Sequence, residues 1–85
     1  MPPALTSAQI RAARALIRWS AEDLARHSTV SVTTIRRAEL KASATVLTRA
    51  NDQAIRRALE NAGVEFIDAE GGGPGVRLRQ PPAEG

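Results

Sequence analysis

The sequence contains no cysteine and a single histidine, His27, among its 85 residues. Without cysteine the chain can form neither a disulfide nor a thiolate metal site, and one imidazole is the only histidine ligand that it could offer to a metal ion. A chain without disulfides fits the reducing cytoplasm, where we expect this protein to act.

Long apolar runs are also lacking. No stretch approaches the ~18 consecutive apolar residues that a membrane-spanning helix needs. Residues 1–10 have no basic region ahead of an apolar stretch, so we expect no secretory signal there. A chain of 85 residues forms one domain with a small core, which buries ~60–65 % of the surface that the unfolded chain exposes and leaves no room for a deep cleft. We therefore expect no membrane association, no cofactor and no small-molecule ligand.

Lysine is rare, and arginine supplies eleven of the twelve basic side chains in a chain of net charge +3. Arginine is a planar, bidentate donor that suits phosphate and guanine. Because many soluble domains carry a net charge of +3, the positions of the arginines are more informative than their number.

Two helices are predicted in the first third of the chain. The first begins near Ser7, because Thr6 and Gln9 match a capping box and apolar residues follow at helical spacing. Ser20 is predicted to cap a second helix that runs to about His27, with acidic residues in its first turn where the helix dipole favours them.

Two further helices follow. Ser31 is predicted to cap a third helix over 32–40, and Asn51 a fourth over 52–62. Gly63 should end the fourth helix in the left-handed conformation. The residues expected on the inward face of this fourth helix are Ile55, Leu59 and Ala62.

Beyond the fourth helix the pattern changes to short strands. Residues 64–68 and 75–79 are strand-like, and the glycine-rich segment between them is typical of a turn, so together they predict a two-stranded hairpin. Across it, Glu65 or Asp68 would face Arg77 or Arg79. An isolated hairpin is marginally stable in water, so this one needs a partner, either its own helices or the hairpin of a second chain. The sequence therefore predicts a mainly α fold, a bundle of about four helices with a C-terminal β-hairpin.

The stretch from Glu22 to Arg37 predicts a helix-turn-helix. Its two short helices are joined by a turn of about three or four residues, which forces a steep crossing. The residues expected to face inward are Leu24, Ala25, Val30, Ile35 and Ala38. The residues left outward around the second helix are Ser31, Val32, Thr33, Thr34, Arg36 and Arg37. Hydroxyls and helix N-terminal N–H groups suit phosphate, an arginine fork suits guanine or phosphate, and small apolar groups suit the thymine methyl.

These residues resemble the Cro/phage-repressor type of helix-turn-helix, the XRE family of bacterial transcription regulators with a lambda-repressor-like domain. The resemblance covers roughly Ile10 to Val64 and is carried by "IRAARALIRWSAEDLA", "VSVTTIRRAE" and "AIRRALENAGV". It implies a compact all-α bundle, commonly of five helices, that usually dimerises and binds palindromic operators.

The resemblance also implies roles for single residues. Those that match positions contacting base edges are Val32, Thr33 and Arg37. Those that match positions near the DNA backbone are Ser31, Thr34 and Arg36. Lys41 and Arg49 flank a segment, either a loop or a helical turn, that approaches the backbone in the family. Arg14 and Glu39 would form a structural ion pair between the first helix and the end of the recognition helix.

The chain departs from the family pattern at three points. Ala21 stands where the family usually has a glutamine that touches phosphate, and Thr29 stands where the turn commonly has glycine. A hairpin replaces the fifth helix, which helps to form the dimer in many relatives. We therefore take the hairpin as the candidate dimerisation element, because an edge strand with apolar residues can pair with its symmetry mate. Its apolar residues are Phe66, Ile67, Val76 and Leu78.

Other conspicuous residues have simpler explanations than a reactive site. A lone histidine at the end of a short helix, such as His27, is usually exposed or C-capping, and Glu22 with Asp23 suit the helix dipole better than acid–base chemistry. The glycine-rich segment lacks the following helix and lysine of a phosphate loop. Trp19 is more readily a partly buried support than a nucleotide-stacking platform.

We therefore predict a dimeric, sequence-specific DNA-binding transcriptional regulator without enzymatic activity, acting in the bacterial cytoplasm at the nucleoid. Residues 1–64 would form the DNA-binding domain, 65–80 the hairpin and 81–85 a disordered tail. The sequence leaves open whether Arg56 and Arg57 extend the DNA footprint or meet a protein. The alternative function is a protein-interaction module, an antitoxin-like or anti-activator subunit with the same fold, which the departures at Ala21 and Thr29 favour.

Overall fold

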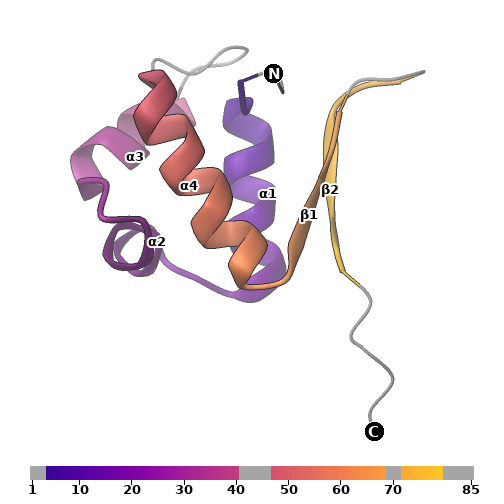
Figure 1. The fold of residues 1–85 in the computed structure, drawn as a ribbon, viewed down its shortest axis with the longest axis horizontal. Helices are drawn as coiled ribbons and strands as arrows, with labels where there is room; N and C mark the ends of the chain where they lie inside the picture. Colours follow the sequence, from indigo (N-terminus) through magenta and orange to yellow (C-terminus); the bar gives the residue numbers. More distant parts are fainter. Residues whose placement is uncertain (1–3, 41–46, 69–71, 80–85) are drawn as a thin grey trace, which may run out of the picture.

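The computed structural model describes residues 4–40, 47–68 and 72–79. Its elements are, in chain order, α1 (Ser7–Ile17), α2 (Ala21–Ser28), α3 (Val32–Leu40), α4 (Arg49–Asn61), β1 (Val64–Ile67) and β2 (Gly75–Leu78). The predicted mainly helical fold with a C-terminal antiparallel hairpin is confirmed. Figure 1 shows α1 between the hairpin on one side and α3 on the other. Lys41 and the tail 81–85 lie outside the described residues.

Short-range capping sets the start of the first two helices. At α1, the Thr6 hydroxyl accepts from the Gln9 N–H at 3.1 Å, and Gln9 Oε1 accepts from the Thr6 N–H at 3.0 Å. Ser20 and Asp23 form the same reciprocal capping box at α2. The hydrogen bond from the Ser20 backbone and a second one from Arg26 lower the pKa of Asp23. Both predicted helix starts are therefore confirmed, because a capping box depends only on residues three apart.

The predicted start of the fourth helix was wrong. Helix α4 begins at Arg49 with Thr48 as its N-cap, and the Thr48 hydroxyl accepts from the Asn51 N–H at 3.1 Å. Threonine and asparagine are both good caps, and the only apolar residue between them is the exposed Ala50, which does not favour either start. The inward position assigned to Ala62 belongs instead to Ala58, since Ala62 is exposed.

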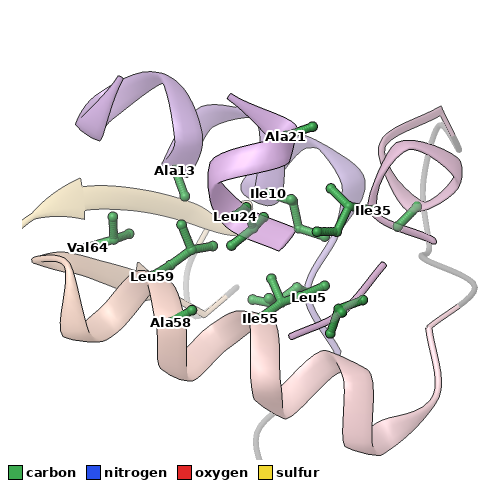
Figure 2. Close-up of a cluster of buried hydrophobic side chains, with 12 residues drawn as sticks. Leu5, Ile10, Ala13, Ala21, Leu24, Ile35, Ile55, Ala58, Leu59 and Val64 are labelled. Atoms are coloured by element: carbon green, nitrogen blue, oxygen red, sulfur yellow. The ribbon is translucent and has the colours of Figure 1, made fainter. Parts of the chain in front are cut away.

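A single apolar core lies between α4 and the helices α1, α2 and α3. In Figure 2, Ile55 and Leu59 of α4 point toward Ile10 and Leu24 across this core. Its buried residues are Leu5, Ile10, Ala13, Ala21, Leu24, Val30, Ile35, Ala38, Ile55, Ala58, Leu59 and Val64. Of the five residues predicted to face inward from the helix-turn-helix, four are buried and Ala25 is half-buried.

The hairpin packs on the helices of its own chain. Phe66 and Val76 lie opposite each other in the register and contact the core, so the structure gives these two apolar residues an intramolecular role. Gln9 Nε2 lies 3.3 Å from the Ile67 carbonyl oxygen and 3.1 Å from that of Gly75, which ties the hairpin to α1. Leu78, by contrast, is 52 % exposed.

On its outer face the hairpin carries the ion pair Glu65–Arg77, with Arg77 Nε 3.1 Å from Glu65 Oε1. This pair is one of the cross-strand combinations that the sequence predicted. Its hydrogen bond lowers the pKa of Glu65 and raises that of Arg77. Because both side chains are exposed, the ion pair adds little to the stability of the hairpin. Its position shows that this face of the hairpin is open to solvent.

Three described backbone positions near helix ends have positive φ, one of them Arg18 at the end of α1 with φ 60°. Gly63 ends α4 with φ +107°, as predicted, and Thr29 ends α2 with φ 59° and ψ 21°. Glycine tolerates this region, whereas an L-residue with a β-branched side chain is strained there.

We expect Thr29→Gly to stabilise the protein by about 0.5–1 kcal/mol, because relief of ~1–2 kcal/mol of left-handed strain exceeds the added entropy of the unfolded chain. The melting temperature should rise by about 3–6 °C in calorimetry. Gly63→Ala is the opposite control and should lower it. A lower melting temperature for Thr29→Gly would mean that the Thr29 hydroxyl bond to the Ser28 carbonyl outweighs the strain.

Candidate nucleic-acid interface

Helix α3 lies on the surface, with Ile35 and Ala38 fully buried beneath it. The residues predicted to contact DNA are distributed along its outer side. Ser31, Thr33, Arg36 and Arg37 are exposed, whereas Val32 and Thr34 are half-buried. Val32 also packs against the core, so only part of its side chain is open to a ligand.

The N-terminus of α3 is capped by hydroxyl groups. Ser31 Oγ accepts from the Thr34 N–H at 3.1 Å, and its own proton goes to Thr34 Oγ1 at 2.9 Å. The Thr34 hydroxyl can therefore still donate to an outside acceptor. The first N–H groups of a helix have no intrahelical partner, and together with the helix dipole they attract anions. This end of α3 thus suits a phosphate group chemically.

The two adjacent arginines have different surroundings. Arg36 forms an ion pair with Glu22 of α2, and both side chains are more than half exposed. Arg37 is exposed, and no other residue in the described parts of the chain forms an ion pair or hydrogen bond with its side chain. A guanidinium without an intramolecular partner keeps all of its donors for an external acceptor.

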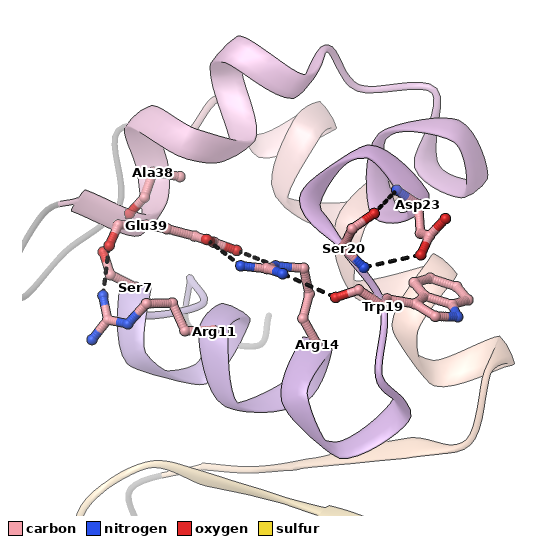
Figure 3. Close-up of polar contacts among 8 residues, drawn as sticks. All are labelled: Ser7, Arg11, Arg14, Trp19, Ser20, Asp23, Ala38 and Glu39. Carbon is pink, nitrogen blue, oxygen red and sulfur yellow. Dashed lines mark hydrogen bonds and ion pairs between the residues drawn. The ribbon is translucent and has the colours of Figure 1, made fainter.

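The C-terminal end of α3 is fixed to α1 by hydrogen bonds (Figure 3). Arg14 forms a bidentate pair with Glu39, with Nε–Oε2 at 2.7 Å and Nη2–Oε1 at 2.8 Å. This contact raises the pKa of Arg14, and a third donor of the same guanidinium reaches the Trp19 carbonyl at 2.9 Å. The Glu39 side chain is only 9 % exposed, so its charge is buried and depends on Arg14.

Two further residues of α1 contribute that the sequence analysis did not identify. Ser7 donates to the carbonyl of Ala38, and Arg11 donates to the carbonyl of Glu39. The last carbonyls of a helix lack intrahelical partners, so these bonds satisfy groups that would otherwise need water. The spacing of Ser7 and Arg11 in the sequence could have indicated a shared contact, because residues four apart lie on one face of a helix. These contacts fix the position of α3 relative to α1.

The remaining basic residues are spread over other surfaces. Arg49 is exposed at the first position of α4. The Arg56 guanidinium lies 5.2 Å from the centre of the Phe66 ring, a cation–π contact within the chain, and Arg57 is exposed. Arg56 therefore packs on the hairpin.

Trp19 and His27 stack on each other, with ring centroids 4.3 Å apart and planes inclined by 13°. Trp19 is half-buried against the core and His27 is exposed, so the tryptophan supports α2. Among the residues that the structure describes, no group of three or more histidine, cysteine or acidic side chains is arranged to hold a metal ion. In the same residues, every helix is too short or too polar to cross a membrane.

No known protein-family model matches this chain, and no curated protein matches it. We therefore infer the function from the position of α3, the contacts that fix it and the side chains that it exposes.

Proposed function

We propose that this protein is a sequence-specific DNA-binding transcription regulator of the Cro/phage-repressor type, and that α3 enters the major groove of its operator. One observation carries the proposal: α3 is fixed on its inner side and at its C-terminal end, yet its outer side exposes hydroxyl groups and Arg37, which has no ion-pair or hydrogen-bond partner among the described residues. An α-helix with side chains is ~10–12 Å wide and fits a major groove of ~12 Å.

In this proposal the outer residues of α3 divide into two groups. Val32, Thr33 and Arg37 contact base edges, with Arg37 suited to the O6 and N7 acceptors of guanine. The residues that contact the DNA backbone are Ser31, Thr34, Arg36, Lys41 and Arg49. The hydroxyl cap of α3 supports the second group, because a helix N-terminus with a free hydroxyl donor suits phosphate.

The Arg36–Glu22 pair adjusts the strength of this contact. A phosphate that accepts from Arg36 has to compete with the Glu22 carboxylate, which also repels it. Arg36 then contributes less to affinity than a guanidinium without an acidic neighbour. The ion pair lowers the attraction of α3 to DNA of any sequence, so that discrimination between base sequences depends on Arg37.

The proposed regulator acts as a homodimer in the bacterial cytoplasm, at the nucleoid. Its two copies of α3 enter successive major grooves ~34 Å apart and bind a pseudo-palindromic site. Regulation follows from occupying a promoter, with no cofactor and no catalytic step. Because phosphate contacts release counterions, affinity falls steeply as salt rises.

A protein-interaction module is the second candidate function. Ala21 favours it, because this residue is buried at the start of α2 and offers no polar side chain to a phosphate. Thr29 no longer supports it, because the turn keeps the left-handed conformation that glycine would adopt there. One of the two departures that favoured this alternative is thereby accounted for.

Selection of the purified protein against a random duplex pool at about 150 mM salt tests the proposed function. We expect an enriched motif with two inverted half-sites one helical turn apart. Trp19 fluorescence in the same samples reports whether the protein is folded. A folded protein that enriches no motif would contradict the proposal, and recovery of a stable hetero-complex from cells would then support the interaction module.

A further inference from the structure

We infer that the second copy binds along the free edge of β2, in antiparallel pairing centred on Val76, about a two-fold axis perpendicular to the hairpin sheet. The inference deepens the proposed function and rests on it for one point, the direction in which the two α3 helices must face. The pairing itself follows from features of the hairpin and α1.

The hydrogen-bonding pattern shows which groups lie on the free edge. Gly63 and Arg79 are a hydrogen-bonded pair, because the Arg79 N–H donates to the Gly63 carbonyl at 2.7 Å. Such pairs alternate along an antiparallel ladder, so in the observed register Gly75 and Arg77 direct their backbone groups toward β1. Val76 and Leu78 therefore direct theirs to the other edge. A row of outward N–H and C=O groups is a template for a further strand.

Side-chain chemistry selects the register of this pairing. Side chains directly opposite each other share a face, so a two-fold axis perpendicular to the sheet must pass through a residue and its own copy. An axis at Arg77 would set two like charges opposite each other, which is destabilising. An axis at Val76 sets Gly75 opposite Arg77 of the second copy instead, and leaves room for the Glu65–Arg77 pair.

Helix α1 offers a second surface beside the same edge. It contacts both strands but mainly β2, whereas α4 packs over β1, so α1 is the helix nearer to the free edge. Its solvent face carries only small or apolar side chains apart from Arg11, namely Ala8, Ala12, Ala15 and Leu16. Leu16 is 39 % exposed and Leu78 is 52 % exposed. Two copies of α1 approach closely when the β2 edges pair, and both leucines lose contact with water.

This axis also places the two α3 helices correctly. The hairpin and α3 lie on opposite sides of α1 (Figure 1), and rotation about an axis perpendicular to the sheet keeps both helical layers on one face of the joined sheet. Both α3 helices then face away from the sheet in the same direction, as one duplex requires. Packing of the outer sheet faces would point them apart and would bury the charged Glu65–Arg77 pair.

Val76→Pro tests the pairing in the full chain without DNA. The Val76 N–H points away from β1, so proline removes a hydrogen bond to the second copy and none within the hairpin. Sedimentation velocity should give a dimer for the wild type and a monomer for Val76→Pro, with circular dichroism and Trp19 fluorescence unchanged. Ala12→Glu should also give a monomer, whereas the control Ala50→Glu, on the exposed start of α4, should stay a dimer. A wild-type monomer, or a folded Val76→Pro dimer, would overturn the inference.

Engineered disulfides test the register, because the chain has no cysteine of its own. Opposite residues in a non-hydrogen-bonded pair have Cα atoms ~4.5 Å apart, within reach of a disulfide. A Cβ at Gly75 meets only Ile67 Cδ1 at 3.9 Å, an ordinary contact. The double variant Gly75→Cys/Arg77→Cys should oxidise to a covalent dimer, while neither single variant should. Cross-linking of Arg77→Cys alone would overturn the Val76-centred register.

Different results would contradict the proposed DNA-binding function and the proposed pairing of β2 edges. A dimer that depends on Val76 but enriches no duplex would support this inference and contradict the proposed function. A wild-type monomer that enriches a single half-site would support DNA binding and overturn this inference.

Discussion

Arg37→Ala is expected to weaken binding to the selected operator by about 5- to 150-fold, which corresponds to ~1–3 kcal/mol. Arg37 is the exposed arginine of α3 without an intramolecular partner in the described residues, so its fork is available for the two acceptors of guanine. The loss should be confined to one base pair in each half-site. Fluorescence anisotropy with the operator, and with duplexes substituted one position at a time, measures it.

Arg36→Ala is the matched control one residue earlier on the same helix. It should weaken binding to all duplexes alike and should lower the salt dependence slightly, because Arg36 is proposed to contact phosphate. Its effect should be smaller than that of a phosphate-binding arginine without the Glu22 partner. Equal losses on every sequence for both variants would show that neither arginine reads the bases, and the division of roles would be wrong.

Arg14→Met should destabilise the fold by about 3–5 kcal/mol, a large share of the ~5–15 kcal/mol that holds a small domain together. The substitution leaves the Glu39 carboxylate, 9 % exposed, without the guanidinium that binds both of its oxygens. It also removes the hydrogen bond to the Trp19 carbonyl. Urea unfolding followed by Trp19 fluorescence and circular dichroism gives the change in the free energy of unfolding.

Two variants show whether the buried charge causes this loss. Arg26→Met removes an ion pair of the same type at the surface, where Arg26 is 68 % exposed, and should cost at most ~1 kcal/mol. The double variant Arg14→Met/Glu39→Leu leaves no unpaired charge and should be more stable than Arg14→Met alone. If the double variant is as unstable as the single one, lost packing explains the effect and the ion pair does not.

Features that depend on neighbouring residues were predictable from the sequence. The starts of α1, α2 and α3 and the stop at Gly63 each follow from a cap or a glycine within a few positions. The apolar spacing also indicated the inward residues of the helix-turn-helix, because a helix repeats every 3.6 residues whatever it packs against. At the start of α4 the local preference favoured Asn51 over the actual cap Thr48, so local rules did not suffice.

The contacts that position the candidate site join residues far apart in the chain, and tertiary packing alone brought them together. Ser7 and Arg11 find the last carbonyls of α3, Arg36 finds Glu22, and Gln9 serves both its own helix cap and the hairpin. The positions of arginines in the sequence show where positive charge lies along a helix. They do not show which group each arginine contacts, because that depends on how two helices cross. The same packing turned Phe66 and Val76 toward the core and left the outer backbone edge of β2 unpaired among the described residues, where we infer that a second copy binds. A strand has two faces and two edges, and its sequence pattern specifies only the faces.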